Sequence, residues 1–166
     1  LKQMGVTTLL FMPLYEFEEI LVLDENKEQK HSKMQLNYWG YTEGSYFAPK
    51  ASFLKENNPD ELKRLILKMH QKSIECILEF YFPQKMNPHL IMDVLHYWRE
   101  EYHVDGFILN PERVPITMFR KDPLLKAVKI LERQDGFLNC MRRFLKGDEG
   151  CVGEAMWHLR HLSSRK

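Results

Sequence analysis

The residues best suited to binding chemistry are aromatic side chains gathered in one short, glycine-containing stretch. They are Tyr38, Trp39, Tyr41, Tyr46 and Phe47. The flat apolar faces of glucose rings stack on such side chains, so one interpretation is a carbohydrate platform. The other is a loop held on the protein by burial of its rings, which contributes a large packing energy. The residues alone leave both interpretations open.

The spacing of the histidines matches no metal-binding motif. Seven are scattered along the chain and none belongs to an HExxH phrase. His158 and His161 are three residues apart, with Glu154 as the one nearby carboxylate, so a solvated helix face is a better interpretation than zinc. The basic group Arg142, Arg143 and Lys146 is likewise expected on a surface helix. We predict no metal and no cofactor.

The three cysteines, Cys76, Cys140 and Cys151, are odd in number and widely spaced. They form neither a CxxC pair nor a ligand cluster. Because disulfides are rare in reducing compartments, we expect free thiols in a cytoplasmic protein.

The elements that must position these residues alternate between strand and helix patterns. Apolar, β-branched runs predict buried strands over Thr7–Leu14, Ile74–Phe82 and Val104–Leu109. Asp24–Lys33 is predicted to be an exposed loop, and Asn37–Phe53 an ordered loop lying over a surface.

Two helices carry clear start signals. Asn58-Pro59 and Asn87-Pro88 each supply a capping side chain followed by a first-turn proline. Each is followed by apolar residues at helical spacing, which are Leu62, Leu65, Ile66 and Met69 in the first helix and Ile91, Val94, Leu95, Trp98 and Tyr102 in the second. Further helices are expected near Pro123 and over Phe137–Leu145.

Alternating strands and helices favour an α/β fold with parallel strands and crossover helices. At 166 residues the chain predicts one domain, but a closed (β/α)8 barrel of the TIM type needs about 250 residues. We therefore expect residues 1–166 to be a partial barrel domain and a fragment of a longer chain.

The composition is that of an ordinary soluble domain. The chain is 44% hydrophobic, with 24 basic and 23 acidic residues. This balance gives no reason to expect a nucleic-acid or acidic-membrane partner. No apolar run approaches the length of a membrane span.

Five phrases, in order along nearly the whole chain, resemble the α-amylase superfamily, and specifically its isoamylase, pullulanase and glycogen-debranching branch. They begin with Leu1-Lys2-Gln3-Met4-Gly5 and the following Met12-Pro13-Leu14-Tyr15. The others are Asn37-Tyr38-Trp39-Gly40-Tyr41, then residues 61–78, residues 95–107, and residues 142–148. The resemblance implies a glycoside hydrolase of the barrel type acting on glycogen, starch or a related oligosaccharide.

The residues at the implied catalytic positions depart from the family. Retaining hydrolysis needs a carboxylate nucleophile and a carboxylic acid about 5 Å apart. The family phrase Gly-Phe-Arg-Phe-Asp stands here as Gly106-Phe107-Ile108-Leu109-Asn110. Asn110 thus occupies the nucleophile position and Ile108 that of an orienting arginine. A neutral amide forms no glycosyl ester and stabilises no oxocarbenium ion.

The third-strand phrase has changed as well. Where the resemblance implies Asp-x-x-x-Asn-His, this chain carries Glu79, Pro83 and Gln84. The acid is expected at the end of a fifth strand, for which Lys129–Glu132 is a candidate, although a helix-surface carboxylate is the preferred interpretation of Glu132. The segment that normally follows, and the loop domain after the third strand, are predicted to be deleted.

We therefore predict a degenerate, catalytically inactive debranching-type domain that binds α-glucan. The implied binding residues are Trp39, Tyr41, Tyr38 and Asp105. Two alternatives remain: an active hydrolase with a rearranged pair, such as Glu79 with Glu132 or Glu112, or a structural segment without a ligand.

Overall fold

The computed structural model describes residues 1–23, 33–110, 113–114 and 116–132. The chain divides into two compact units, Leu1–Leu131 and Glu132–Lys166. All the described residues except Glu132 belong to the first unit. The predicted helix over residues 137–145, the histidines at 158 and 161, Glu154, Cys140, Cys151, Glu112 and the basic group at 142–146 lie outside the described residues.

The described elements alternate between strands and helices along the second half of the unit. The strands are β1 (Thr8–Phe11), β2 (Tyr15–Phe17), β3 (Ile20–Leu23), β4 (Lys33–Leu36), β5 (Gly44–Pro49), β6 (Glu75–Glu79), β7 (Gly106–Leu109) and β8 (Lys129–Glu132). The α-helices are α1 (Asp60–Gln71), α2 (Pro88–Tyr102) and α3 (Ile116–Lys121). Short 3-10 helices span Lys2–Met4, Ala51–Phe53 and Lys55–Asn57.

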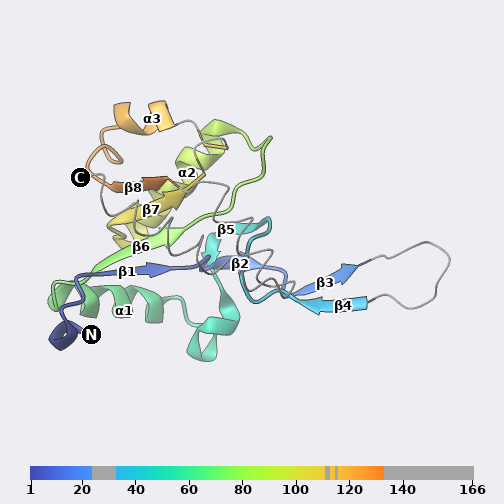
Figure 1. Cartoon of the computed structure of the whole chain (residues 1–166), viewed down its shortest axis with the longest axis horizontal. Coiled ribbons are helices and arrows are strands. Elements are labelled where there is room, and N and C mark those ends of the chain that lie inside the picture. Colours follow the sequence, from blue (N-terminus) through green and yellow to red (C-terminus); the bar gives the residue numbers. More distant parts are fainter. Residues whose placement is uncertain (24–32, 111–112, 115, 133–166) are drawn as a thin grey trace, which may run out of the picture. The chain divides into compact units, whose positions relative to one another are not determined.

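The main sheet has four strands in the order β1-β6-β7-β8 (Figure 1). β1 and β6 are parallel, and β6 and β7 are parallel, with Glu79 aligned to Ile108. This confirms the predicted α/β class with parallel strands. Gly106 is required at the β7–β8 contact, because a Cβ there would lie 2.6 Å from the Lys129 carbonyl oxygen.

The start predicted at Asn87-Pro88 is confirmed, whereas α1 begins one residue later than predicted, at Asp60, with Pro59 as its N-cap residue. The Asn58 side-chain oxygen accepts a hydrogen bond of 3.0 Å from the Asp60 amide, and that of Asn87 accepts one of 2.9 Å from the His89 amide. These bonds satisfy first-turn amides that have no partner within the helix. The predicted apolar face of α2 is buried throughout, whereas on α1 Leu65 is 46% exposed.

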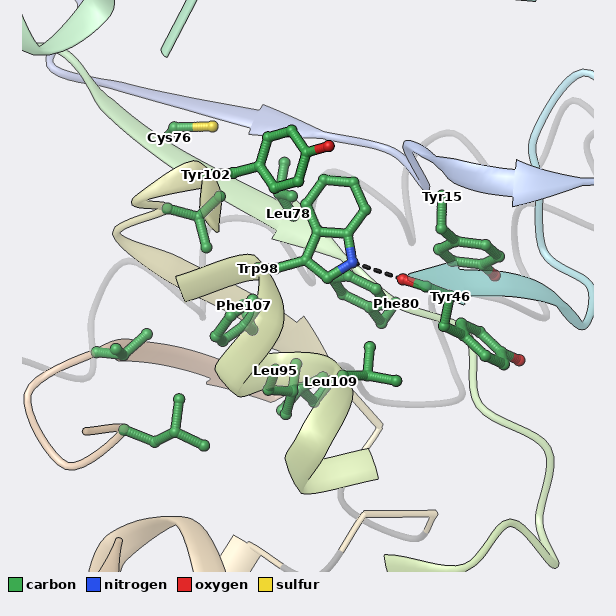
Figure 2. Close-up of a cluster of buried hydrophobic side chains, with 14 of the residues drawn as sticks. Tyr15, Tyr46, Cys76, Leu78, Phe80, Leu95, Trp98, Tyr102, Phe107 and Leu109 are labelled. Atoms are coloured by element: carbon green, nitrogen blue, oxygen red, sulfur yellow. Dashed lines mark hydrogen bonds between the residues drawn. The ribbon is translucent and has the colours of Figure 1, made fainter. Parts of the chain in front are cut away.

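The core lies on one face of the sheet. Cys76 and Leu78 of β6 and Phe107 and Leu109 of β7 pack there with the buried faces of α1 and α2. Trp98 of α2 is fully buried at its centre and donates a hydrogen bond of 2.7 Å to the Tyr46 carbonyl oxygen of β5 (Figure 2). This bond attaches the inserted β2–β5 pair to the helix layer.

Three sequence predictions need correction. Thr7–Leu14 is not a fully buried strand, because β1 lies at the end of the strand order and Leu10 is 55% exposed. Asn37–Phe53 is more than a loop, since β5 pairs with β2 in antiparallel fashion. The exposed loop predicted over Asp24–Lys33 ends earlier, because Lys33 begins β4, which pairs with β3 in antiparallel fashion; residues 24–32 lie outside the described residues.

The short helix expected near Pro123 begins earlier, because α3 spans Ile116–Lys121 and residues 123–127 form turns. The Asp122 side chain explains this boundary. Its oxygen accepts hydrogen bonds from the amides of Leu124 and Leu125, which supports a turn in place of a helix.

Candidate functional site

The candidate site lies at the carboxyl ends of β6 and β7. Glu79 is the last residue of β6 and is only 7% exposed. Its carboxylate accepts a hydrogen bond of 2.9 Å from the Tyr41 hydroxyl, so the predicted aromatic loop reaches this strand end. In parallel α/β sheets, ligands bind outside the carboxyl ends of the strands.

Asn110 follows β7 directly and is 9% exposed. It lies two residues beyond Ile108, the register partner of Glu79, and so belongs to the same edge of the sheet. Tyr41, Glu79 and Asn110 each take part in further interactions, so these polar groups are held within the fold. The buried carboxylate of Glu79 and the buried amide of Asn110 therefore lie at the edge of the sheet where the resemblance implies catalysis.

Arg113, which the sequence did not single out, connects the segments that follow β6 and β7. Arg113 donates a hydrogen bond of 3.1 Å from Nη1 to the Phe82 carbonyl oxygen, and its guanidinium lies 4.7 Å from the centre of the Tyr81 ring. The Arg113 amide also donates to the Asn110 carbonyl oxygen at 3.0 Å. This cation therefore links the segments that follow β6 and β7.

The hydroxyl groups of two buried tyrosines hold the aromatic loop, residues 37–53, in place. Tyr15 is fully buried, and its one hydroxyl hydrogen is shared between the carbonyl oxygens of Thr42 at 2.8 Å and Gly40 at 3.0 Å. Tyr46 is buried and donates to the Tyr81 carbonyl oxygen at 3.0 Å. Burial raises the pKa of Tyr15 above its usual range and that of Tyr46 to about 12, so both remain neutral donors.

The five predicted aromatic residues therefore divide between the two interpretations. Tyr46 is a core residue, while Tyr38 is 71% exposed and Phe47 is 44% exposed. Trp39 and Tyr41 are half-buried in the loop. Trp39 and Tyr41 thus combine an anchored backbone with partly accessible rings.

The remaining predicted positions are spread more widely. Gln84 is exposed in the turn after β6, and Pro83 is half-buried. Glu132 is the last residue of β8, so its backbone is in a strand and the preferred helix-surface interpretation was wrong; its side chain lies outside the described set.

Asp105 precedes β7 and so lies at the opposite end of this strand from Asn110. Its Oδ2 accepts a hydrogen bond of 2.8 Å from the Cys76 amide and lies 2.9 Å from Nε2 of His70. The structure therefore does not bring Asp105 together with Tyr41, Glu79 and Asn110. Burial raises the pKa of the neighbouring Cys76 thiol to about 12, which keeps it protonated.

Within the described part of the chain, no group of three or more His, Cys, Asp or Glu residues is arranged to hold a metal ion. The described helices include none with the length and apolar character needed to cross a membrane.

No protein-family model matches the chain. Individual proteins do match. Rice isoamylase 3 (Oryza sativa subsp. japonica, chloroplastic) is 22% identical over 241 residues, covering 92% of this chain and 30% of the isoamylase. Bacillus subtilis pullulanase is 24% identical, covering 76% of this chain and 23% of the pullulanase. The glycogen operon protein GlgX homolog of Haemophilus influenzae is 27% identical, covering 61% of this chain and 16% of that protein.

The chain is thus similar to isoamylases, a pullulanase and a glycogen operon protein at 22 to 27% identity. It spans less than a third of the length of each of these three relatives. The alignment to rice isoamylase 3 extends over 241 residues although the whole chain has 166, so the isoamylase contains segments without a counterpart here.

Proposed function

We propose that this chain is a degenerate debranching-type domain that binds α-glucan at the carboxyl ends of β6 and β7 without hydrolysing it. The observation that carries the proposal is the pairing of Glu79 with Tyr41 beside the neutral Asn110, at one edge of a parallel sheet. The similarity to isoamylases and a pullulanase supplies the class of ligand.

The proposed lack of hydrolysis follows from the missing negative charge at the nucleophile position. The family mechanism needs a negatively charged nucleophile near the developing oxocarbenium ion. Asn110 carries no charge, and Ile108 offers no positive group to orient a carboxylate. Glu79 is a carboxylate at the adjoining strand end, but its oxygen already accepts the Tyr41 hydroxyl. These features support binding over bond cleavage.

We propose that the described strands and helices form an arc of a (β/α)8 barrel. The helices α1 and α2 pack together on one face of the sheet, as the outer helices of a barrel do. One half of a doubly wound fold shares this arrangement, so the proposal of a barrel also draws on the resemblance described above. The unmatched segments of rice isoamylase 3 support the predicted internal deletions.

Hydrolysis is tested by incubating the protein with glycogen and with pullulan and measuring new reducing ends. We expect none. The double variant Asn110→Asp/Ile108→Arg is expected to remain inactive as well, because we propose that the segment carrying the family's acid is deleted and that Glu132, at the end of β8, does not replace it. Recovery of activity in that variant would refute the deletion, and activity of the unaltered protein would favour a rearranged pair that includes Glu79.

Binding is tested by electrophoresis through native gels that contain glycogen. Retarded migration is expected, and Trp39→Ala should reduce it. Phe47→Ala is the matched control, because Phe47 is an exposed aromatic residue that packs on Tyr97 of α2 and not at the strand ends. Unchanged migration of the unaltered protein would favour a structural segment without a ligand.

A further inference from the structure

Tyr81 follows Glu79, the last residue of β6, by two positions and lies on the same side of the chain. Phe80 and Phe82 are both buried, and their rings stack with centroids 5.5 Å apart. The Phe80 amide also continues the strand pairing, with a hydrogen bond of 3.1 Å to the Ile108 carbonyl oxygen. The chain is therefore extended here, and its side chains alternate between two sides. Glu79 and Tyr81 share the side away from the two phenylalanine rings.

The backbone of Tyr81 also lies against the aromatic loop. Its carbonyl oxygen is 3.4 Å from the hydroxyl oxygen of Tyr15, which contacts the carbonyl oxygens on either side of Tyr41 as well. The Tyr41 hydroxyl in turn donates to Glu79. One buried hydroxyl group therefore brings the loop and the segment after β6 together, and Tyr81 belongs to the edge at which glucan binding is proposed.

A cation fixes the ring of Tyr81. The Arg113 guanidinium lies 4.7 Å from the centre of this ring and is itself held by the bond of 3.1 Å from Nη1 to the Phe82 carbonyl oxygen. A guanidinium over an aromatic face is attracted by the electron density of the ring. Tyr81 is half-buried, so part of its ring stays accessible to solvent. Arg113 thus covers one face of the ring, and the opposite face is the one that a ligand can use.

An aromatic ring that is already ordered is a better surface for a sugar than a mobile one. A glucose unit stacks its apolar face on such a ring, and the entropy lost in ordering a side chain on binding reduces the affinity. Arg113 removes most of this cost for Tyr81. Tyr38, in contrast, is 71% exposed and would have to be ordered by the ligand.

We propose that Tyr81 is a further residue that contacts the glucan and that Arg113 is its positioning residue. A glucose unit stacks on the face of the Tyr81 ring opposite the guanidinium, at the same edge as Tyr41 and Glu79. The inference rests on the proposed function, because the ligand is the same neutral α-glucan. Neither Tyr81 nor Arg113 is among the positions that the resemblance implied.

The first test compares variants in native gels that contain glycogen at several concentrations, which gives an apparent dissociation constant for each. Tyr81→Leu removes the ring and should weaken binding about tenfold. Tyr81→Phe keeps the ring and should recover most of that loss. Tyr97→Leu is the matched control, because Tyr97 is a half-buried tyrosine of α2 that packs on Phe47, and its loss should leave binding unchanged.

The second test separates positioning of the ring from general stability. A ligand that binds only the folded state raises the midpoint of thermal unfolding by an amount set by its affinity. Arg113→Ala should reduce the rise produced by maltoheptaose, whatever its effect on the midpoint without sugar. Lys63→Ala is the control, because it removes a cation that lies 5.4 Å from the centre of the Tyr102 ring, and it should keep the full rise.

The outcomes distinguish this inference from the proposed function. Equal retardation of Tyr81→Leu and the unaltered protein would overturn the inference and leave the proposed function in place. An undiminished rise in Arg113→Ala, or a Tyr81→Phe variant as weak as Tyr81→Leu, would do the same. If glycogen does not retard the unaltered protein, both are overturned.

Discussion

The Tyr41 hydroxyl donates a hydrogen bond of 2.9 Å to a carboxylate oxygen of Glu79. The two residues are 38 positions apart, and the bond connects the aromatic loop to the carboxyl end of β6. Because Glu79 is buried, its charge depends on such donors. The loop and the carboxylate therefore form one unit, and a ligand at this edge must meet both.

Removing the Tyr41 hydroxyl should weaken the fold as well as the site. For Tyr41→Phe we expect the free energy of unfolding, measured by urea denaturation, to fall by about 1.5 kcal/mol, the lower end for a bond to a charged group, since Glu79 keeps other interactions. Tyr38→Phe is the control, because Tyr38 is 71% exposed. An equal loss in both variants would contradict the importance of this bond.

Trp98 should be among the most sensitive core residues. Trp98→Phe removes the donor to the Tyr46 carbonyl oxygen and leaves unfilled volume at a fully buried position. A loss of about 2–4 kcal/mol in the free energy of unfolding is expected. Trp39→Phe, in the half-buried loop, should cost less than about 1 kcal/mol. Comparable losses would argue against Trp98 as the anchor of β5.

The contact between β7 and β8 predicts a local effect of Gly106→Ala. The new methyl group would lie 2.6 Å from the Lys129 carbonyl oxygen, so the strands must separate at a cost of about 1–3 kcal/mol. Hydrogen exchange of the Lys129 amide, which donates to the Asp105 carbonyl oxygen at 3.0 Å, should become faster.

Gly5→Ala is the comparison for this variant. Gly5 has a φ of 78° but no heavy atom within 4 Å of an added Cβ. Its substitution carries a backbone cost alone and should leave exchange at Lys129 unchanged. Unchanged exchange in Gly106→Ala would contradict the close approach of the two strands.

Alkaline pH should unfold the protein. Burial raises the pKa of Cys76 from 9.0 to about 12 and that of Tyr46 from 10.0 to about 12. Above about pH 9 the unfolded chain therefore releases protons that the folded chain retains, and the free energy of unfolding falls until about pH 12. Urea denaturation at several pH values measures this slope. Tyr46→Phe should make it shallower, and an unaltered slope would contradict the role of Tyr46.

The elements set by local signals were predictable from the sequence. The caps at Asn58 and Asn87 and the apolar spacing along α2 are contained within one helix each, and all were found. The exposure of Leu65 depends on the absence of a packed neighbour beside α1, which helical periodicity does not encode. The pairing of β5 with β2 likewise depends on contacts between distant segments.

The positions of site residues were predictable where they depend only on the order of the strands. Glu79 ends β6 and Asn110 directly follows the parallel strand β7, so their common edge follows from the alternation of strands and helices. Asp105 precedes β7, and its bonds to Cys76 and His70 are tertiary contacts that the resemblance did not indicate. The position of Arg113 over Tyr81 also arises only after two loops have met.

The carbonyl oxygen of Tyr81 accepts a hydrogen bond of 3.0 Å from the Tyr46 hydroxyl and lies 3.4 Å from the hydroxyl oxygen of Tyr15. Tyr15 and Tyr81 both lie outside residues 37–53, so the partners that hold Tyr46 and the backbone of this insertion come from distant segments of the chain. A synthetic peptide of residues 37–53 would therefore have no native scaffold on which to order.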